Sequence, residues 1–200
     1  MATIIPSLPQ HLQPLYNNLL QNPPYGFFPS SAQLVRRILR YAQIQAGLEI
    51  LEPSAGSGVL ARAARAYGAI VDVIELDPRL QTLLIQQGFN LVGSNLMTAT
   101  PTKLYPRIIA NPPFSQSENL RGTDINHIQR MYQYFLAPGG RLVSVVSNSM
   151  NKRYCPRAEA FQHFLDRIPA NVYDLPLEIF WETERPVTVE AYLIVAEKPS

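Results

Sequence analysis

The chain has 200 residues, of which 46% are hydrophobic, and its formal net charge is +2. This length suffices for one domain with a full α/β core, and so small a net charge does not by itself indicate a nucleic-acid-binding protein; a strongly basic patch would have to be local. The one cysteine, Cys155, excludes an internal disulfide framework and fits a reducing compartment.

Targeting, membrane and metal signals are absent from the sequence. The first residues carry neither a basic region nor a sustained apolar run, so we expect no signal peptide. No stretch approaches the roughly 20 apolar residues of a membrane span. His11, His127 and His163 show no metal-ligand spacing with Cys155. We therefore expect a soluble, cytoplasmic protein of a single domain, with no metal site and no membrane partner.

The first half of the chain predicts strands that alternate with helices. Residues 1–29 are rich in proline and predict a short helix followed by an extended arm that ends at YGFFPSS. Apolar segments predict strands at residues 48–51, 69–75, 90–92 and 107–110. Helices are expected at residues 31–45, 58–67 and 78–87, the first of them capped by Ser30 or Ser31.

The second half predicts three more strands. Helices are expected at residues 124–136 and 157–167, and strands at residues 140–147, 171–175 and 187–197. The segment GRLVSVVS is continuously apolar, which is typical of a strand buried on both faces. Alternating strands and helices imply right-handed βαβ units, so we predict an α/β protein with a mostly parallel sheet of seven strands and a final hairpin.

The turn EPSAGSG follows the first predicted strand, at the edge of a parallel sheet where ligands bind. Gly56 and Gly58 allow positive φ and a close approach of the backbone to a ligand. The pattern is neither GxGxxG nor a P-loop, so it does not favour a dinucleotide or a nucleoside triphosphate. The alternative is that these glycines only make a tight strand-to-helix turn.

Glu75 ends the neighbouring predicted strand, within reach of a ligand on the glycine turn. A carboxylate at this position can accept both hydroxyl groups of a ribose, and Leu76 and Asp77 would flank an attached purine. The alternative is a solvated strand end. The joint occurrence of this acid and the glycine turn favours the ligand site.

The segment NPPF follows the fourth predicted strand. Two prolines cannot continue a central strand, because they lack N–H donors and fix φ, so the chain must leave the sheet and hold Asn111 and Phe114 in a rigid loop. Such a loop suits the binding of a flat group that bears an amino group. The alternative assigns Phe114 to the core.

Together, YGFFPSS, LEPSAGSG, VIELD and NPPF resemble the class I S-adenosylmethionine-dependent methyltransferases, in the branch that modifies amino groups. The similarity extends to short phage- and plasmid-type N6-adenine DNA methylase-like proteins. It implies a single-domain Rossmann-like methyltransferase fold: a seven-stranded, mostly parallel sheet with helices on both faces and a C-terminal antiparallel hairpin. The methyltransferase domain would span residues 30–200, after an N-terminal arm of residues 1–29.

The resemblance also implies roles for single residues. Catalysis would involve Asn111, Pro112, Pro113 and Phe114, with the Asn111 side-chain carbonyl and the Pro112 main-chain carbonyl accepting the amino protons and Phe114 stacking on the base. S-adenosyl-L-methionine, the implied cofactor, would contact Phe28, Pro29, Glu52, Pro53, Ser54, Ala55, Gly56, Gly58, Glu75, Leu76, Asp77, Ser94, Asn95 and Asn111. The family usually has an acid where this chain has Ser94 and Asn95, so that contact loses its charge.

The substrate implied by the resemblance is a nucleic acid, first of all the N6 amino group of adenine in DNA. Lys152, Arg153 and Tyr154 follow the strand at residues 140–147 and could bind the target strand through its phosphates, or form a solvated loop. The chain has no room for a sequence-recognition region, so specificity could come from a partner protein. RNA, a protein glutamine side chain and an inactive accessory role remain open alternatives.

Overall fold

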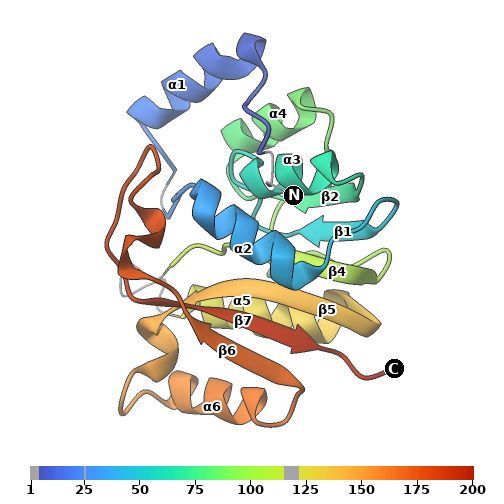
Figure 1. Ribbon diagram of the computed structural model, residues 1–200, viewed down its shortest axis with the longest axis vertical. Helices are drawn as coiled ribbons and strands as arrows, with labels where there is room; N and C mark the ends of the chain where they lie inside the picture. The colour runs from blue at the N-terminus through green and yellow to red at the C-terminus, as the bar shows by residue number, and fades with distance from the viewer. Residues whose placement is uncertain (1–4, 25, 115–121) are drawn as a thin grey trace.

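The computed structural model describes residues 5–24, 26–114 and 122–200. In that part of the chain, seven strands form one sheet in the order β3-β2-β1-β4-β5-β7-β6 (Figure 1). The strands are β1 (Glu49–Glu52), β2 (Ile70–Ile74), β3 (Asn90–Gly93), β4 (Tyr105–Ala110), β5 (Leu136–Ser147), β6 (Ala170–Asp174) and β7 (Ala191–Glu197).

The sheet is mostly parallel. The pairs β2–β3, β1–β2, β1–β4 and β4–β5 are parallel, whereas β7 is antiparallel to both β5 and β6. The predicted fold class, with its seven strands and closing antiparallel hairpin, is confirmed. The hairpin does not simply extend the sheet, however, because β7 inserts between β5 and β6.

Helices cover both faces of the sheet, because successive residues of each buried strand point to opposite sides. Ile50 belongs to the core cluster under α2 (Ala32–Ala42) and α3 (Val59–Ala66), and its neighbour Leu51 to the cluster under α5 (Thr123–Arg130) and α6 (Pro156–Leu165). Figure 1 shows α2 in front of the sheet and α5 behind it.

The N-terminal arm packs on the domain. It contains a 3-10 turn, η1 (Gln10–Leu12), and α1 (Gln13–Gln21), which packs beside α4 (Pro78–Gln86) at the top of Figure 1. A small core joins the two helices, in which Tyr16 and Leu19 of α1 meet Leu80 and Leu83 of α4. The predicted short helix in the arm is therefore present.

Three predicted boundaries differ from the structure by four residues or more. The helix expected at residues 124–136 ends at Arg130 and continues as one π-helical turn, η3 (Met131–Phe135). Strand β5 starts at Leu136 rather than Gly140, because Leu136 already pairs with Tyr105 before the register shifts. Strand β7 starts at Ala191 rather than residue 187, so residues 187–190 belong to a loop.

The other elements lie in the connections. They are the 3-10 turns η4 (Asn148–Asn151) and η5 (Leu177–Phe180). Among the described residues, no helix combines the length and the apolar character needed to cross a bilayer.

Candidate functional site

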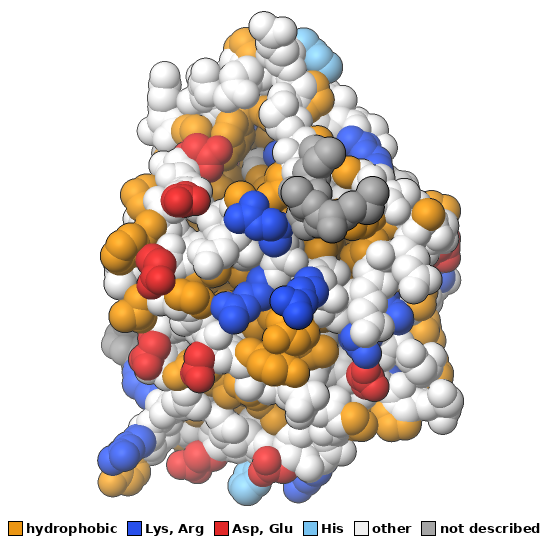
Figure 2. Space-filling view, viewed as in Figure 1, with side chains coloured by type: hydrophobic (Ala, Val, Ile, Leu, Met, Phe, Trp, Pro, Cys, Tyr) orange, Lys and Arg blue, Asp and Glu red, His pale blue; other side chains and the backbone are white. Residues whose placement is uncertain are grey.

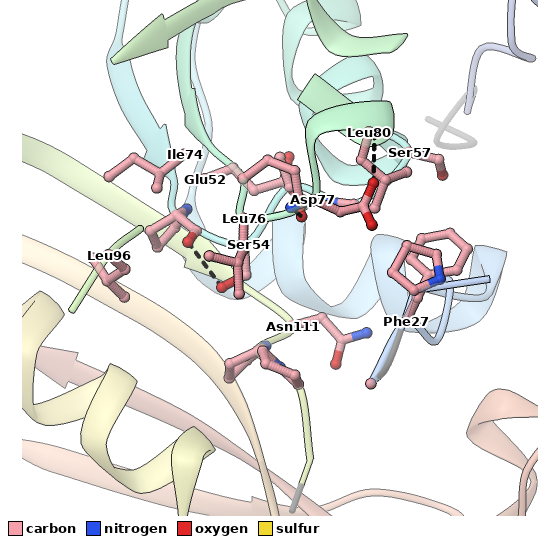
Figure 3. Close-up of a pocket in the computed structure, with 18 of the residues that line it drawn as sticks. Phe27, Glu52, Ser54, Ser57, Ile74, Leu76, Asp77, Leu80, Leu96 and Asn111 are labelled. Atoms are coloured by element: carbon pink, nitrogen blue, oxygen red, sulfur yellow. Dashed lines mark hydrogen bonds between the residues drawn. The ribbon is translucent and has the colours of Figure 1, made fainter. Parts of the chain in front are cut away.

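A cavity of about 470 Å³ opens at the carboxyl ends of the first four strands (Figure 3). It receives one segment after each strand, and all predicted cofactor and catalytic residues except Gly58 line it: Phe28, Pro29, Glu52, Pro53, Ser54, Ala55, Gly56, Glu75, Leu76, Asp77, Ser94, Asn95, Asn111, Pro112, Pro113 and Phe114. The parallel sheet thus brings together segments that lie far apart in the sequence.

Close contacts leave no room for a side chain at Gly56 or Gly58 of the glycine turn. Gly56 has a φ of +54°, and a Cβ atom there would lie 3.1 Å from the Phe27 ring. Gly58 has a φ of +80°, and its Cβ would lie 2.9 Å from Leu84 of α4. Gly56 therefore lets the arm approach the turn, whereas Gly58 lets α3 start against α4 and does not line the cavity.

Glu75 fixes the turn to the end of β2. Its Oε2 accepts a hydrogen bond from Gly56 N at 2.7 Å, and its Oε1 accepts one from Asp77 N at 2.9 Å. The residue is 9% exposed, and burial raises its pKa despite these two donors. Glu75 is therefore a buried, ordered carboxylate, which excludes the alternative of a solvated strand end.

Asp77 has a structural role in addition to lining the cavity. Its side chain caps α4 by accepting from Arg79 N at 2.8 Å, and it pairs with the Arg79 guanidinium at 2.8 Å. This hydrogen bond to Arg79 is the main reason why the pKa of Asp77 is lowered. Leu76, between the two acids, is 69% exposed and leaves an apolar side chain at the mouth of the cavity.

Glu52 is the most deeply buried acid of the cavity. It is 2% exposed, and its Oε2 has no hydrogen-bond partner among the described residues. Burial raises its pKa well above the usual value, although the guanidinium of Arg62 opposes the shift. A buried acceptor without a partner costs free energy, so it identifies a place for a hydrogen-bonding or cationic ligand.

Asn111 presents a second unused acceptor. Its Nδ2 donates to Phe28 O at 3.3 Å and to Ser30 Oγ at 3.1 Å. Because a main-chain carbonyl can only accept, this pair fixes the orientation of the amide. The opposite atom, Oδ1, is buried without a partner in the described part of the chain. In the view of Figure 3, Asn111 lies between Phe27 and Ser54.

Phe114 is part of the core, as the alternative interpretation held. It is 6% exposed and packs edge-on against Phe180 of η5, with ring centroids 5.6 Å apart. It nevertheless lines the cavity and also a second, neighbouring groove. Burial of Phe114 does not test its contact with a base, which stays a prediction.

The segment after β3 contributes two uncharged polar side chains to the cavity wall. Ser94 and Asn95 both line the cavity. The Asn95 Oδ1 accepts a hydrogen bond from Met97 N at 2.8 Å and so orders the turn that follows β3. This part of the cavity is polar without being charged.

Lys152, Arg153 and Tyr154 lie outside the cavity, in a groove of about 920 Å³ that follows β5. Arg157 is a third basic residue of the groove. No acidic residue lines the groove in the described part of the chain. Tyr154 is 95% exposed and has a φ of +55°, an uncommon conformation for a residue other than glycine. Phe114 connects the groove with the cavity.

Two further groups of aromatic and basic side chains do not line the cavity or the groove in the described part of the chain. Phe180 is buried, whereas Trp181 is 55% exposed and donates a hydrogen bond to Thr188 Oγ1. Figure 2 shows basic side chains gathered over α2, whose Arg36 and Arg40 are exposed.

The sequence did not reveal His127 as a titratable member of the cavity wall. His127 of α5 lines the cavity and is 9% exposed, and its Nδ1 lies 3.2 Å from Ser54 Oγ. Burial lowers its pKa to about 4. The only available signal was a histidine within an amphipathic segment, and that signal does not indicate which element the ring will meet.

Comparison with known proteins supports the fold. The chain matches no protein-family model. Over 105 residues it is 34% identical to ribosomal RNA small subunit methyltransferase A of Pseudomonas fluorescens (strain Pf0-1), a match that covers 46% of this chain and 38% of that protein. The chain thus matches less than half of this curated relative.

Solved structures give a more complete match at low identity. A modification subunit of a putative type I restriction enzyme from Vibrio vulnificus has a TM-score of 0.66 at 16% identity, covering 94% of this chain and 48% of its own. N-methyltransferase NodS from Bradyrhizobium japonicum, in complex with S-adenosyl-L-homocysteine, has a TM-score of 0.64 at 15% identity, covering 96% and 100%. The chain therefore has the α/β Rossmann-like fold of methyltransferases, and it spans about half the length of the restriction-enzyme subunit.

Proposed function

We propose that this chain transfers a methyl group from S-adenosyl-L-methionine to an exocyclic amino group of a nucleobase, and that N6 of adenine in DNA is the substrate to test first. One observation carries the proposal: Asn111 holds a buried acceptor, Oδ1, which has no partner among the described residues, in a cavity lined by the glycine turn. The amino group of a nucleobase would supply the missing donor.

The cavity suits this cofactor. S-adenosylmethionine supplies an activated methyl group and presents a cationic sulfonium, an amino-acid end and a ribose. Glu52, with its unused Oε2, would accept from the amino-acid ammonium, whose charge would favour the ionised carboxylate. Glu75, held by two main-chain amides, would keep its remaining lone pairs for the ribose hydroxyls.

The other predicted contacts agree with the cavity lining. Gly56 leaves room for the backbone to approach the ligand, and Phe28 and Pro29 also line the cavity. Leu76 would pack on the purine, with Asp77, Ser94 and Asn95 beside it. These are proposals about a ligand, and each can be tested by substitution.

The NPPF segment would act by positioning the target amino group. The lone pair of an amino group on a base is delocalised into the ring, which makes the nitrogen a poor nucleophile. The Asn111 Oδ1 and the Pro112 carbonyl would accept its two hydrogens, favour a tetrahedral nitrogen and localise the lone pair. The bonds from Asn111 Nδ2 to Phe28 and Ser30 hold Oδ1 ready before the substrate arrives.

A target strand would enter along the groove. Lys152 and Arg153 supply positive charge for phosphates, and Tyr154 offers an exposed ring for stacking. A base that passes from the groove into the cavity would contact Phe114, which lines both. Stacking contributes about 1–3 kcal/mol per base, comparable with the few kcal/mol needed to extrude a base from a duplex.

RNA is the second candidate substrate. It is favoured by the curated relative, a ribosomal RNA methyltransferase that is 34% identical over 105 residues. The proposed chemistry is the same in both cases, because it depends on the amino group and not on the sugar. A sequence-specific choice of target would require a partner protein, since in the described part of the chain the groove carries charge and two aromatic rings, Phe114 and Tyr154, but no element large enough to fill a DNA groove.

The decisive experiment measures transfer of labelled methyl groups from S-adenosylmethionine to unmethylated duplex DNA, single-stranded DNA, total RNA and cell protein. Nucleoside analysis identifies the product, and Asn111→Ala serves as the control. Label in N6-methyladenine of DNA supports the first substrate, and label in RNA replaces it by the second. Label in protein alone, or cofactor binding without transfer to any substrate, contradicts the proposal and favours a protein substrate or an accessory role.

A further inference from the structure

His127 is a buried titratable side chain that the proposed chemistry does not use. It lies on α5 and lines the same cavity as Asn111 and Ser54, yet it is 9% exposed. A histidine buried in a small-molecule cavity, with one ring nitrogen engaged, is a candidate for a proton transfer.

The contacts of Ser54 define the tautomer of His127. Ser54 Oγ lies 2.8 Å from Pro53 O and 3.2 Å from His127 Nδ1. Pro53 O can only accept, and two oxygens at 2.8 Å repel unless a proton lies between them, so the single hydroxyl proton of Ser54 points to Pro53. Ser54 can then only accept from His127. Nδ1 therefore carries the ring proton and Nε2 keeps its lone pair.

The imidazole is also held in place by its helix. Asp124, one turn earlier on α5, is fully buried; its Oδ2 accepts from Ser147 N at 2.8 Å and from Ser147 Oγ at 2.6 Å. The same carboxylate accepts from Ser149 Oγ at 3.0 Å. These bonds anchor the first turn of α5 to the end of β5, so the position of His127 is set before any ligand binds.

We propose that His127 is a catalytic residue whose Nε2 accepts the proton that the target amino nitrogen releases when it is methylated. This inference rests on the proposed function. As the new carbon–nitrogen bond forms, the carbon–sulfur bond of the methyl donor breaks and its electron pair stays on sulfur. In the same step one N–H bond of the amino nitrogen breaks, its electron pair stays on nitrogen, and the proton forms an N–H bond at Nε2, from which it passes to water. One methyl group enters and one proton leaves.

The protonation state of His127 agrees with this role. Burial lowers its pKa to about 4, an effect that the carboxylate of Asp124 partly opposes, so the ring is neutral near pH 7. A weakly basic imidazole is sufficient, because the amino nitrogen becomes a far stronger acid than imidazolium as its bond to the methyl group forms. Among the described residues, the recorded hydrogen bonds of His127 use Nδ1 and leave Nε2 available.

The tautomer can be tested without turnover. We would record nitrogen-15 NMR spectra of the histidine side chains in the full chain, with the exposed His11 and His163 as internal references. The expected result is the Nδ1–H tautomer for His127 and a shift of the population toward Nε2–H in Ser54→Ala. An Nε2–H tautomer in the unsubstituted protein would overturn the inference, since Nε2 could then accept no proton.

The rate tests the catalytic role. In single-turnover methyl transfer at saturating cofactor, His127→Gln is expected to lower the rate about 100-fold, at the low end of general-base effects, with cofactor affinity within about twofold. Added imidazole should restore part of the activity of His127→Ala. His163→Gln, on the exposed face of α6, is the matched control and should keep the full rate.

The outcomes distinguish the role of His127 from the proposed function itself. An unchanged rate in His127→Gln, while Asn111→Ala abolishes transfer, rejects the role of His127 and leaves the proposed function intact. A parallel loss of rate and cofactor affinity, without rescue by imidazole, also rejects it, because it indicates a ligand-binding or packing role. Absence of transfer by the unsubstituted chain to every substrate rejects both claims together.

Discussion

The cavity and the groove meet at Phe114 but have opposite electrostatic character. Three acids, Glu52, Glu75 and Asp77, line the cavity, and no lysine or arginine does in the described part of the chain. The groove lining is the reverse, with Lys152, Arg153 and Arg157 and no described acid. This contrast agrees with the proposal that one sheet edge serves two ligands, a buried cationic cofactor and an exposed polyanion.

The two sites also differ in how completely their polar groups are satisfied. Each carboxylate oxygen of Glu75 accepts from a main-chain amide, whereas Glu52 and Asn111 each keep a buried acceptor without a described partner. Groove residues can instead bond to water, because the groove is open. Substitutions in the cavity should therefore have large, ligand-specific effects, and substitutions in the groove small effects that depend on salt.

The largest expected effect is that of Asn111→Ala. Removing the acceptor for the amino group should lower methyl transfer by about 10²–10³-fold or more, as for the loss of a preorganised hydrogen-bonding group, while cofactor affinity stays nearly unchanged. Transfer assays and calorimetric titration measure the two quantities. Asn17→Ala, on the exposed face of α1, is the control. A large loss of cofactor affinity would show that Asn111 contacts the cofactor and not the target.

His127 should make the stability depend on pH. Its pKa is about 4 in the folded chain and about 6.5 in the unfolded chain, so the unfolded chain binds more protons between these values. Stability therefore falls as the pH falls from about 6.5 to 4, by up to about 3 kcal/mol. His127→Gln should remove this loss, and His163→Gln should not.

Denaturant unfolding at several pH values measures that prediction. The difference between variant and unsubstituted chain is the relevant quantity, because Glu52 and Glu75, whose pKa values are raised, act with the opposite sign as the pH changes. If the stabilities of both chains depend equally on pH, folding does not lower the pKa of His127.

Gly56→Ala tests how tightly the arm closes the cavity. The new Cβ would carry the strain of φ +54° and also lie 3.1 Å from the Phe27 ring. Gly47→Ala is a matched control, with a φ of +78° but no atom within 4 Å of the new Cβ. Strain alone costs about 1–2 kcal/mol, so Gly47→Ala should lose about that much stability and Gly56→Ala more. Equal losses would show that Phe27 moves aside freely.

Glu75→Ala should weaken cofactor binding by about tenfold or more, through the lost hydroxyl contacts and the two amides left without their acceptor. Titration with S-adenosylhomocysteine measures the affinity. Glu49→Ala removes an exposed carboxylate from the start of β1 and is the control. Unchanged affinity in Glu75→Ala would mean that the ribose is held elsewhere.

The smallest effect is expected in the groove. Replacing Lys152 and Arg153 together by Ala should reduce the slope of log affinity for nucleic acid against log salt by about two, with little change in cofactor affinity. Arg36 and Arg40 of α2, replaced in the same way, test whether any exposed arginine pair has the same effect. Equal slopes for the groove variant and the unsubstituted chain would reject the phosphate role.

Local signals in the sequence were enough to predict the fold class and more than half of the cavity wall. Strand-helix alternation implies a parallel sheet, and a parallel sheet brings the residues after each strand to one edge. EPSAGSG, Glu75 and NPPF could therefore be assigned to one site from their positions in the chain. These are local signals: a periodicity, a turn and the residues that follow a strand.

Only the tertiary structure decided how side chains from different elements meet. Asn111 takes its orientation from Phe28, which lies 83 residues earlier, and His127 reaches Ser54 across 73 residues. The insertion of β7 between β5 and β6 is equally non-local. Such contacts depend on the rotation of each helix and on the packing of the layers, which the spacing of residues within one element does not encode.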